Sequence, residues 1–280
     1  MKTGLVLEGG AMRGMFTAGV MDVLMENDVD FDGVIGVSAG AAFGCNYKSK
    51  QIGRVIRYNT RFCADKRYCG LESLLKTGNI YNTDFCYSTV PLEIDPFDFA
   101  AYDANPQEFY VVCTDIESGQ PVYHKYLGKN DHGFDWIRAS ASMPLVSRIV
   151  EIEGRKLLDG GIADSIPVRY FQSIGYDRNV VVLTQPKDYQ KGKNSAMPLI
   201  RMKYSCSSLS AASPWTPTAM LPYSLHFKLH AAKIREISPA NRLLSQAGAF
   251  WLSGGRWYRR PLDVQGLFPR GRPAMARAGE

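Results

Sequence analysis

The hydrophobic positions of the first 45 residues follow the order strand, helix, strand, helix. Residues 4–7 form a short apolar run that ends in a glycine-rich turn, and apolar residues then recur at helical spacing from residue 15 to about residue 27. Residues 31–37 are predicted to form a second strand, in which Val34, Ile35 and Val37 are apolar without alternation, as in a strand buried on both faces. The small residues at 39–43 suit a helix packed closely on a sheet. This order predicts a βαβ unit and therefore a parallel sheet.

The pattern after residue 45 is less regular but keeps the same α/β character. It predicts helices at 52–62, 71–75, 135–142 and 167–174, and strands at 109–114, 121–126, 149–152, 156–158 and 179–183. Glu153-Gly154 is predicted to turn a hairpin. Residues 78–106 contain many Pro, Asp and Asn residues, and we expect them to be excursions over the surface.

The composition suits one large domain, or one domain with an appendage. The chain has 280 residues, of which 45% are hydrophobic and 21% are charged. It contains no apolar run of about 18 residues, the length that a membrane-spanning helix needs. The apolar run near its start is short and soon followed by a charged residue, which is not typical of a secretory signal. The six cysteines form no C-x-x-C pair and no metal-ligand spacing with the four histidines. We therefore expect free thiols, a cytoplasmic location, and neither a metal nor a cofactor.

The basic charge of the chain is confined to its C-terminal part. The formal net charge is +6, yet residues 207–280 hold ten Lys and Arg against three Asp and Glu, whereas residues 1–206 balance at −1. Residues 1–206 therefore show no basic cluster of the kind that binds nucleic acid, and nucleic acid is not expected as a partner. Residues 207–280 also lack apolar periodicity. A reading frame shifted from about residue 205, a basic tail that touches a membrane, and disorder are three hypotheses for this atypical tail.

Ser38 occupies a sequence position typical of a catalytic nucleophile. Residues 36–40 read Gly-Val-Ser-Ala-Gly, a G-x-S-x-G motif that by itself is weak evidence for a catalytic serine. The predicted structure around the motif strengthens this evidence, because a strand is predicted to end just before Ser38 and a helix to begin just after it. Glycines at 36 and 40 allow the sharp turn that presents such a serine above a sheet. The alternative is that Ser38 only caps the helix.

A nucleophile also needs an oxyanion site and a base. Gly9, Gly10 and Ala11 follow the first strand and can expose backbone N–H groups toward Ser38 at the end of the neighbouring strand. None of the four histidines is favoured as the base. Asp159 is the better candidate, because it ends an apolar segment and two glycines follow it. A carboxylate with an ordinary pKa near 4 is a weak base, so it would have to bond the hydroxyl directly.

Three ordered motifs resemble those of the patatin-like phospholipases, including bacterial members: Glu8-Gly9-Gly10-Ala11-Met12-Arg13-Gly14, the G-x-S-x-G string, and Asp159-Gly160-Gly161. The resemblance covers residues 3–206. It implies a three-layer sandwich with a largely parallel central sheet and helices on both faces. It also implies a Ser38–Asp159 dyad without histidine that hydrolyses acyl esters of phospholipids, lysophospholipids or neutral lipids. The further residues that it implies are an oxyanion or substrate-binding set (Gly9, Gly10, Ala11, Arg13, Gly14 and Ala39) and an elbow (Gly36 and Gly40).

One position departs from the family pattern. Ala11 stands where the family has a third glycine, and its methyl group disfavours a positive φ. Arg13 matches a position that is often basic in bacterial members, and a cation at a helix start is unfavourable with the helix dipole, which favours a functional role.

Four hypotheses remain open: the patatin-type serine hydrolase, an α/β-hydrolase, a degenerate dinucleotide loop at residues 9–14, and a lipid-binding protein of the patatin fold with impaired catalysis. The first is preferred. An α/β-hydrolase elbow normally follows several strands and its triad needs a histidine, whereas a dinucleotide loop needs an acid at the end of the second strand. The expected partner is a lipid or another acyl ester, with transient contact to a membrane surface as a further option.

Overall fold

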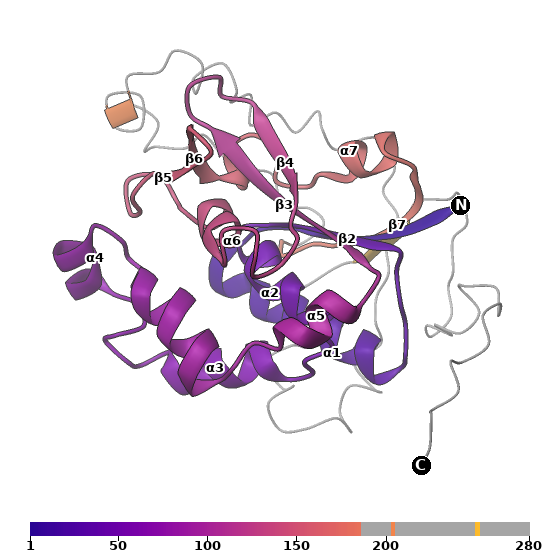
Figure 1. The fold of residues 1–280 in the computed structure, drawn as a ribbon, viewed down its shortest axis with the longest axis horizontal. Helices are drawn as coiled ribbons and strands as arrows, with labels where there is room; N and C mark the ends of the chain where they lie inside the picture. Colours follow the sequence, from indigo (N-terminus) through magenta and orange to yellow (C-terminus); the bar gives the residue numbers. More distant parts are fainter. Residues whose placement is uncertain (186–202, 205–249, 253–280) are drawn as a thin grey trace.

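The computed structural model describes residues 1–185, 203–204 and 250–252. At its centre lies an eight-stranded sheet with the order β5-β6-β3-β2-β1-β7-β8, in which β4 also pairs with β3 (Figure 1). The strands are β1 (Lys2–Leu7), β2 (Gly33–Val37), β3 (Glu108–Asp115), β4 (Pro121–Lys125), β5 (Val150–Ile152), β6 (Arg155–Asp159), β7 (Tyr176–Val182) and β8 (Phe250–Leu252). The four central strands β3, β2, β1 and β7 are parallel, and the strands beyond them are antiparallel.

Helices cover both faces of the sheet, which confirms the three-layer α/β class. The helical segments are η1 (Ala11–Arg13), α1 (Gly14–Glu26), α2 (Ala39–Lys48), α3 (Arg54–Phe62), α4 (Leu71–Thr77), η2 (Phe85–Ile94), α5 (Phe99–Ala104), α6 (Asp135–Ser140), η3 (Gly160–Ile162) and α7 (Val168–Ser173). Alternate residues of β1 face opposite layers: Leu5 and Leu7 pack in the core with α1, α2 and α6, whereas Val6 packs with Phe171 of α7. Figure 1 shows α7 on the far side of the sheet from α1, α2 and α5.

The strand register brings the first turn and the serine corner together. Leu7 of β1 pairs with Gly36 of β2, and Val37 pairs with Val112 of β3. The carboxyl ends of these parallel strands therefore meet at one edge of the sheet, which is where ligands bind in open α/β sheets. The βαβ order predicted from the hydrophobic pattern is confirmed, and so is the hairpin, in which Glu153 and Gly154 both have positive φ.

The prediction for residues 78–106 was wrong. This segment contains η2, a π-helical stretch, and α5, and it buries Phe85, Val90, Phe97 and Tyr102. A π-helix has a wider turn than an α-helix, and Phe85, Val90 and Pro91 follow neither the 3.6-residue nor the two-residue period. The predictions for the tail at 207–280 lie outside the described residues, except that Phe250–Leu252 pairs with β7.

Candidate active site

Ser38 lies at a sharp corner between β2 and α2. Its backbone has φ 55° and ψ −119°, a conformation that is strained for a residue with a side chain. A Cβ on Gly36 would lie 2.4 Å from the carbonyl oxygen of Gly40, and a Cβ on Gly40 would lie 2.3 Å from that of Leu7. Both flanking glycines are thus required by backbone that passes directly beside them. The turn has the geometry of a nucleophile elbow.

Asp159 contacts the Ser38 hydroxyl directly, although 121 positions separate the two residues in the chain. Ser38 Oγ donates to Asp159 Oδ2 at 2.7 Å, and the other carboxylate oxygen, Oδ1, accepts the amide of Gly161 at 2.8 Å. Both side chains are buried, with exposed fractions of 8% and 7%. A Cβ on Gly160 would lie 2.1 Å from the carbonyl oxygen of Val112, so the glycine lets β6 end against β3.

Two hydroxyl groups that sequence reasoning missed hold this pair in place. Ser140 Oγ accepts the amide of Ser38 at 2.8 Å and donates to the carbonyl of Val112. Thr114 Oγ1 donates to the carbonyl of Asp159 at 2.8 Å. Ser140 lies near the end of the helix predicted at 135–142, and no local pattern assigns it a partner. Its contact depends on where α6 meets the sheet.

The glycine-rich turn lies beside Ser38, as predicted. A Cβ on Gly9 would stand 3.0 Å from the Cβ of Ser38. Among the residues that the structure describes, nothing accepts a hydrogen bond from the amides of Gly9, Gly10 and Ala11. Ala11 adopts φ 48° despite its methyl group, so the alanine takes the left-handed conformation that its side chain disfavours.

Thr184, which follows β7, anchors the start of this glycine-rich turn. Its amide donates to Glu8 Oε2 at 2.6 Å and its hydroxyl donates to the carbonyl of Gly9 at 2.6 Å. Burial raises the pKa of the Glu8 carboxyl, and the hydrogen bonds from Thr184 oppose that rise. A Cβ on Gly10 would meet Thr184 Oγ1 at 2.5 Å, which explains the second glycine of the turn.

The other predicted binding residues lie at different distances from this centre. Ala39 is buried at the start of α2 and lines the cavity beside Ser38. Gly14 is buried where a Cβ would press on Phe43 and Ala39. Arg13 is exposed and is not among the residues that line the cavity. Its proposed role stays a prediction.

A cavity of about 120 Å³ opens beside Ser38. Its walls come from α2, α3, η2, α6 and the segment that follows α6, and most of the side chains from α2 and η2 are apolar or aromatic. The main apolar and aromatic lining residues are Ala42, Phe43, Tyr58, Tyr87, Val90, Pro91, Phe134, Ile137 and Met143. The shape and chemistry of this wall suit a hydrocarbon chain.

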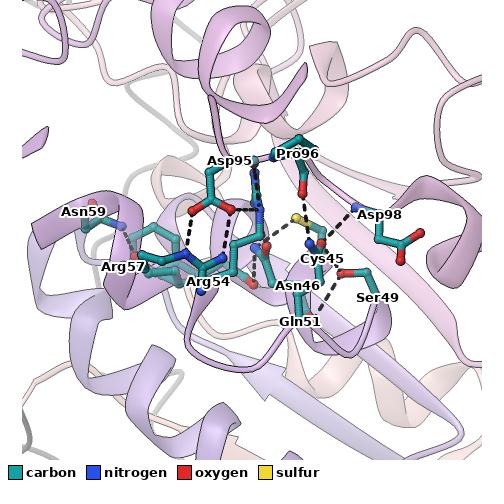
Figure 2. A network of polar contacts seen from close by, with 12 residues as sticks. Cys45, Asn46, Ser49, Gln51, Arg54, Arg57, Asn59, Asp95, Pro96 and Asp98 are labelled. Carbon is teal, nitrogen blue, oxygen red and sulfur yellow. Dashed lines mark hydrogen bonds and ion pairs between the residues drawn. The ribbon is translucent and has the colours of Figure 1, made fainter. Parts of the chain in front are cut away.

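The wall formed by η2 is tied to the body by a polar network (Figure 2). The Arg54 guanidinium is buried, donates to Asn46 Oδ1 at 2.7 Å and pairs with Asp95, which follows η2. Arg57 donates to both carboxylate oxygens of Asp95 at 2.8 Å. Gln51 adds a bond to the carbonyl of Pro96 at 3.0 Å. The network thus joins the end of η2 to α2 and α3, and it fixes the far wall of the cavity.

Neither cysteines nor histidines compete with Ser38 for the nucleophile and base roles within the described residues. Burial raises the pKa of the cavity-lining thiols of Cys45 and Cys86 to about 12, so both are protonated near neutral pH. His124 stacks on Trp136 and contacts Asp131 at 2.7 Å, and it does not line the cavity. Ser38 and Asp159 are therefore the candidate nucleophile and base of this site.

A family model of patatin-like phospholipases matches residues 5–171. Since this match covers more than half of the chain, the protein belongs to the patatin-like phospholipase family. The chain is 34% identical over 192 residues to the uncharacterized protein YjjU of Escherichia coli. The aligned region covers 65% of this chain and 52% of that protein. The chain is also 30% identical over 187 residues to lysophospholipase nte1 of Aspergillus terreus. That aligned region covers 62% of this chain and 11% of that enzyme.

Among solved structures, VipD from Legionella pneumophila is similar over 58% of this chain and 46% of that chain, with 14% identity and a TM-score of 0.35. The chain spans about half the length of the Escherichia coli relative and about a tenth of the fungal one. Within the described part of the chain, no helix has the length and apolar content needed to cross a bilayer.

Proposed function

We propose that this protein is a serine acyl hydrolase that cleaves carboxylic ester bonds of lipids through a Ser38–Asp159 dyad and an acyl-enzyme. The observation that carries the proposal is the 2.7 Å hydrogen bond from Ser38 Oγ to Asp159 Oδ2 beside a cavity with many apolar and aromatic lining residues. The family membership and the fungal relative named a lysophospholipase support a lipid ester as the substrate.

The first half of the reaction forms the acyl-enzyme. Ser38 Oγ attacks the ester carbonyl carbon while its proton passes to Asp159 Oδ2. The carbonyl oxygen becomes an oxyanion that accepts hydrogen bonds from the amides of the 9–11 turn. Collapse of this intermediate breaks the bond to the alcohol, which takes the proton from Asp159. The fatty acyl group then remains on Ser38, with its chain in the cavity.

The second half releases the fatty acid. Asp159 accepts a proton from a water molecule that attacks the acyl-enzyme, and the same amides stabilise the second oxyanion. Ser38 leaves with the proton held by Asp159, which restores the hydrogen bond of the resting site. Because free aspartate is a weak base, most of the rate enhancement must come from the oxyanion site, where one donor contributes about 10²–10³ in kcat.

A fluorophosphonate probe tests the activated serine. We expect the wild type to be labelled, Ser38→Ala not to be labelled, and Asp159→Asn to be labelled at least about 10-fold more slowly. Ser147→Ala is the matched control, because Ser147 lines the same cavity and should be dispensable. Release of fatty acid from phosphatidylcholine, lysophosphatidylcholine and triacylglycerol then identifies the ester. A folded wild type that is not labelled would contradict the proposal and favour the lipid-binding protein with impaired catalysis.

A further inference from the structure

Helix α4 presents two leucines to solvent on one side. Leu71 and Leu75 are 69% and 79% exposed, and among the described residues only Met1 is a more exposed large hydrophobic residue. They stand four positions apart, so they lie on the same face of the helix. Ser73, between them, faces inward and is buried. Figure 1 shows α4 projecting at one end of the molecule, beyond α3.

The chain around these leucines is basic. Residues 61–76 contain four exposed cations against two acids, whereas residues 1–206 as a whole have a formal charge of −1. The cations are Arg61, Lys66, Arg67 and Lys76. Asp65 is paired with Arg67 at 2.8 Å and Glu72 with Lys76 at 2.7 Å, so Arg61 and Lys66 supply the local excess of positive charge. Two exposed leucines within a local excess of positive charge are the features of an element that lies in an anionic membrane interface.

Helix α4 is hydrogen-bonded to a residue that lines the cavity. Ser73 Oγ donates to the carbonyl of Asn79 at 2.8 Å, and Asn79 itself lines the cavity. Asn79 Oδ1 accepts the amide of Arg148 at 2.8 Å, next to the cavity residue Ser147. A surface that binds α4 is therefore held beside a wall of the cavity that Ser38 also lines.

We infer that Leu71 and Leu75, with the surrounding cations, form a docking surface for an anionic lipid bilayer and seat the cavity entrance on it. This inference rests on the proposed lipid hydrolase function. The leucines enter the interfacial region of the bilayer, while the cations contact the lipid phosphates. Docking therefore affects the hydrolysis of lipids that are in a bilayer, and it does not affect the hydrolysis of a soluble ester.

The test compares the full-length wild type with the double variant Leu71→Ser/Leu75→Ser. We expect the wild type to cosediment with vesicles of equimolar phosphatidylcholine and phosphatidylglycerol, more weakly with pure phosphatidylcholine, and less as salt is raised. The double variant should lose at least about 10-fold in binding to the anionic vesicles, because two leucine side chains no longer partition. Its hydrolysis of vesicle lipid should fall in parallel, whereas hydrolysis of p-nitrophenyl butyrate should be unchanged.

Leu127→Ser is the matched control. Leu127 is 64% exposed, but it lies on another element, directly after β4. The amide of its neighbour Tyr126 donates to the carbonyl of Phe109, which places Leu127 near the start of β3. Equal vesicle binding by the double variant and the wild type would overturn the inference, and so would an equal loss in Leu127→Ser. A wild-type dimer that the double variant converts to a monomer would also overturn it, by assigning the face to a second copy. If p-nitrophenyl butyrate is not hydrolysed, the proposed function fails, while cosedimentation still decides the docking surface.

Discussion

Ser140 holds Ser38 at its corner: the Ser140 hydroxyl accepts the Ser38 amide at 2.8 Å and donates to the carbonyl of Val112. Ser140 is fully buried, so Ser140→Ala leaves the Ser38 amide without its partner in a place that water does not reach. An unsatisfied buried donor costs about 1–3 kcal/mol. We predict that the free energy of unfolding, measured by urea denaturation, falls by that amount and that the rate of fluorophosphonate labelling falls with it.

Ser173→Ala serves as the control for Ser140. The Ser173 hydroxyl is on α7 and donates only to the local carbonyl of Tyr170, at an exposed position. Its removal should change stability by no more than about 0.5 kcal/mol and leave labelling unchanged. Wild-type labelling in a folded Ser140→Ala protein would show that the elbow keeps its geometry without this hydrogen bond.

Ala11 lies at φ 48°, so replacing it with glycine should stabilise the protein. A left-handed alanine costs about 1–2 kcal/mol, whereas glycine in place of alanine loses about 0.5–1 kcal/mol of chain entropy. The difference predicts a gain of roughly 0.5–1 kcal/mol for Ala11→Gly, measured by urea denaturation, with the oxyanion amides retained. The comparison variant Ala101→Gly, inside α5, should instead lose about 1 kcal/mol. Equal losses in both variants would contradict the strain assigned to Ala11.

The central part of the fold could be predicted because its signals are local. The apolar runs before Gly9 and Ser38 mark strands, and the glycines after them mark turns, so the βαβ unit and the serine corner follow from neighbouring residues. The strand end and the two glycines at Asp159 indicate a candidate base, and the structure brings its carboxylate within hydrogen-bonding distance of Ser38.

The remaining features depend on contacts between distant segments. Thr184 and Ser140 sit in ordinary sequence, and they reach the site only because β7 lies beside β1 and α6 packs on β3. The sequence predicts excursions over the surface where η2 forms the cavity wall, because a π-helix shows neither of the two common hydrophobic periods. Its contact with α3 through Arg54 and Asp95 is equally invisible from local pattern.

Glu108 gives the protein a defined acid dependence of stability. Burial of its carboxyl raises the pKa, but hydrogen bonds from Lys125, Tyr176 and Lys2 outweigh this and bring the pKa to about 2, below the ordinary 4.5. A group whose pKa is lower in the folded protein stabilises it above the unfolded pKa and loses this contribution as pH falls. We predict that Glu108→Gln lowers the Tm at pH 7 and that the difference from wild type shrinks from pH 4.5 toward pH 2.

Glu117→Gln is the control for this pH dependence, since Glu117 is 68% exposed and pairs with Lys156 at 3.2 Å on the surface. Its Tm should stay close to that of the wild type at every pH, because exposed ion pairs contribute little. A constant difference between Glu108→Gln and the wild type from pH 7 to pH 3 would show that Glu108 acts through packing and not through its charge.

Thr184 anchors the 9–11 turn through its hydroxyl group. Thr184→Val keeps the shape of the side chain but removes the hydrogen bond that the hydroxyl donates to the carbonyl of Gly9. The turn then loses its fixed position beside Ser38, and the amides proposed to stabilise the oxyanion are no longer aligned. We predict a fall of at least about 10-fold in kcat for a soluble ester with little change in KM, because the amides act mainly in the transition state.

Thr184→Ser separates this role from a loss of packing. Serine restores the hydroxyl without the methyl group, so it should recover most of the kcat while the free energy of unfolding stays slightly reduced. Thr184→Val should keep the low kcat and also lose about 1–3 kcal/mol in the free energy of unfolding, since it keeps the buried methyl group but removes the donor to the carbonyl of Gly9. If both variants keep the wild-type kcat, Thr184 does not position the turn. If Thr184→Ser loses it and Thr184→Val keeps it, the methyl group and not the hydroxyl holds Gly9 beside Ser38.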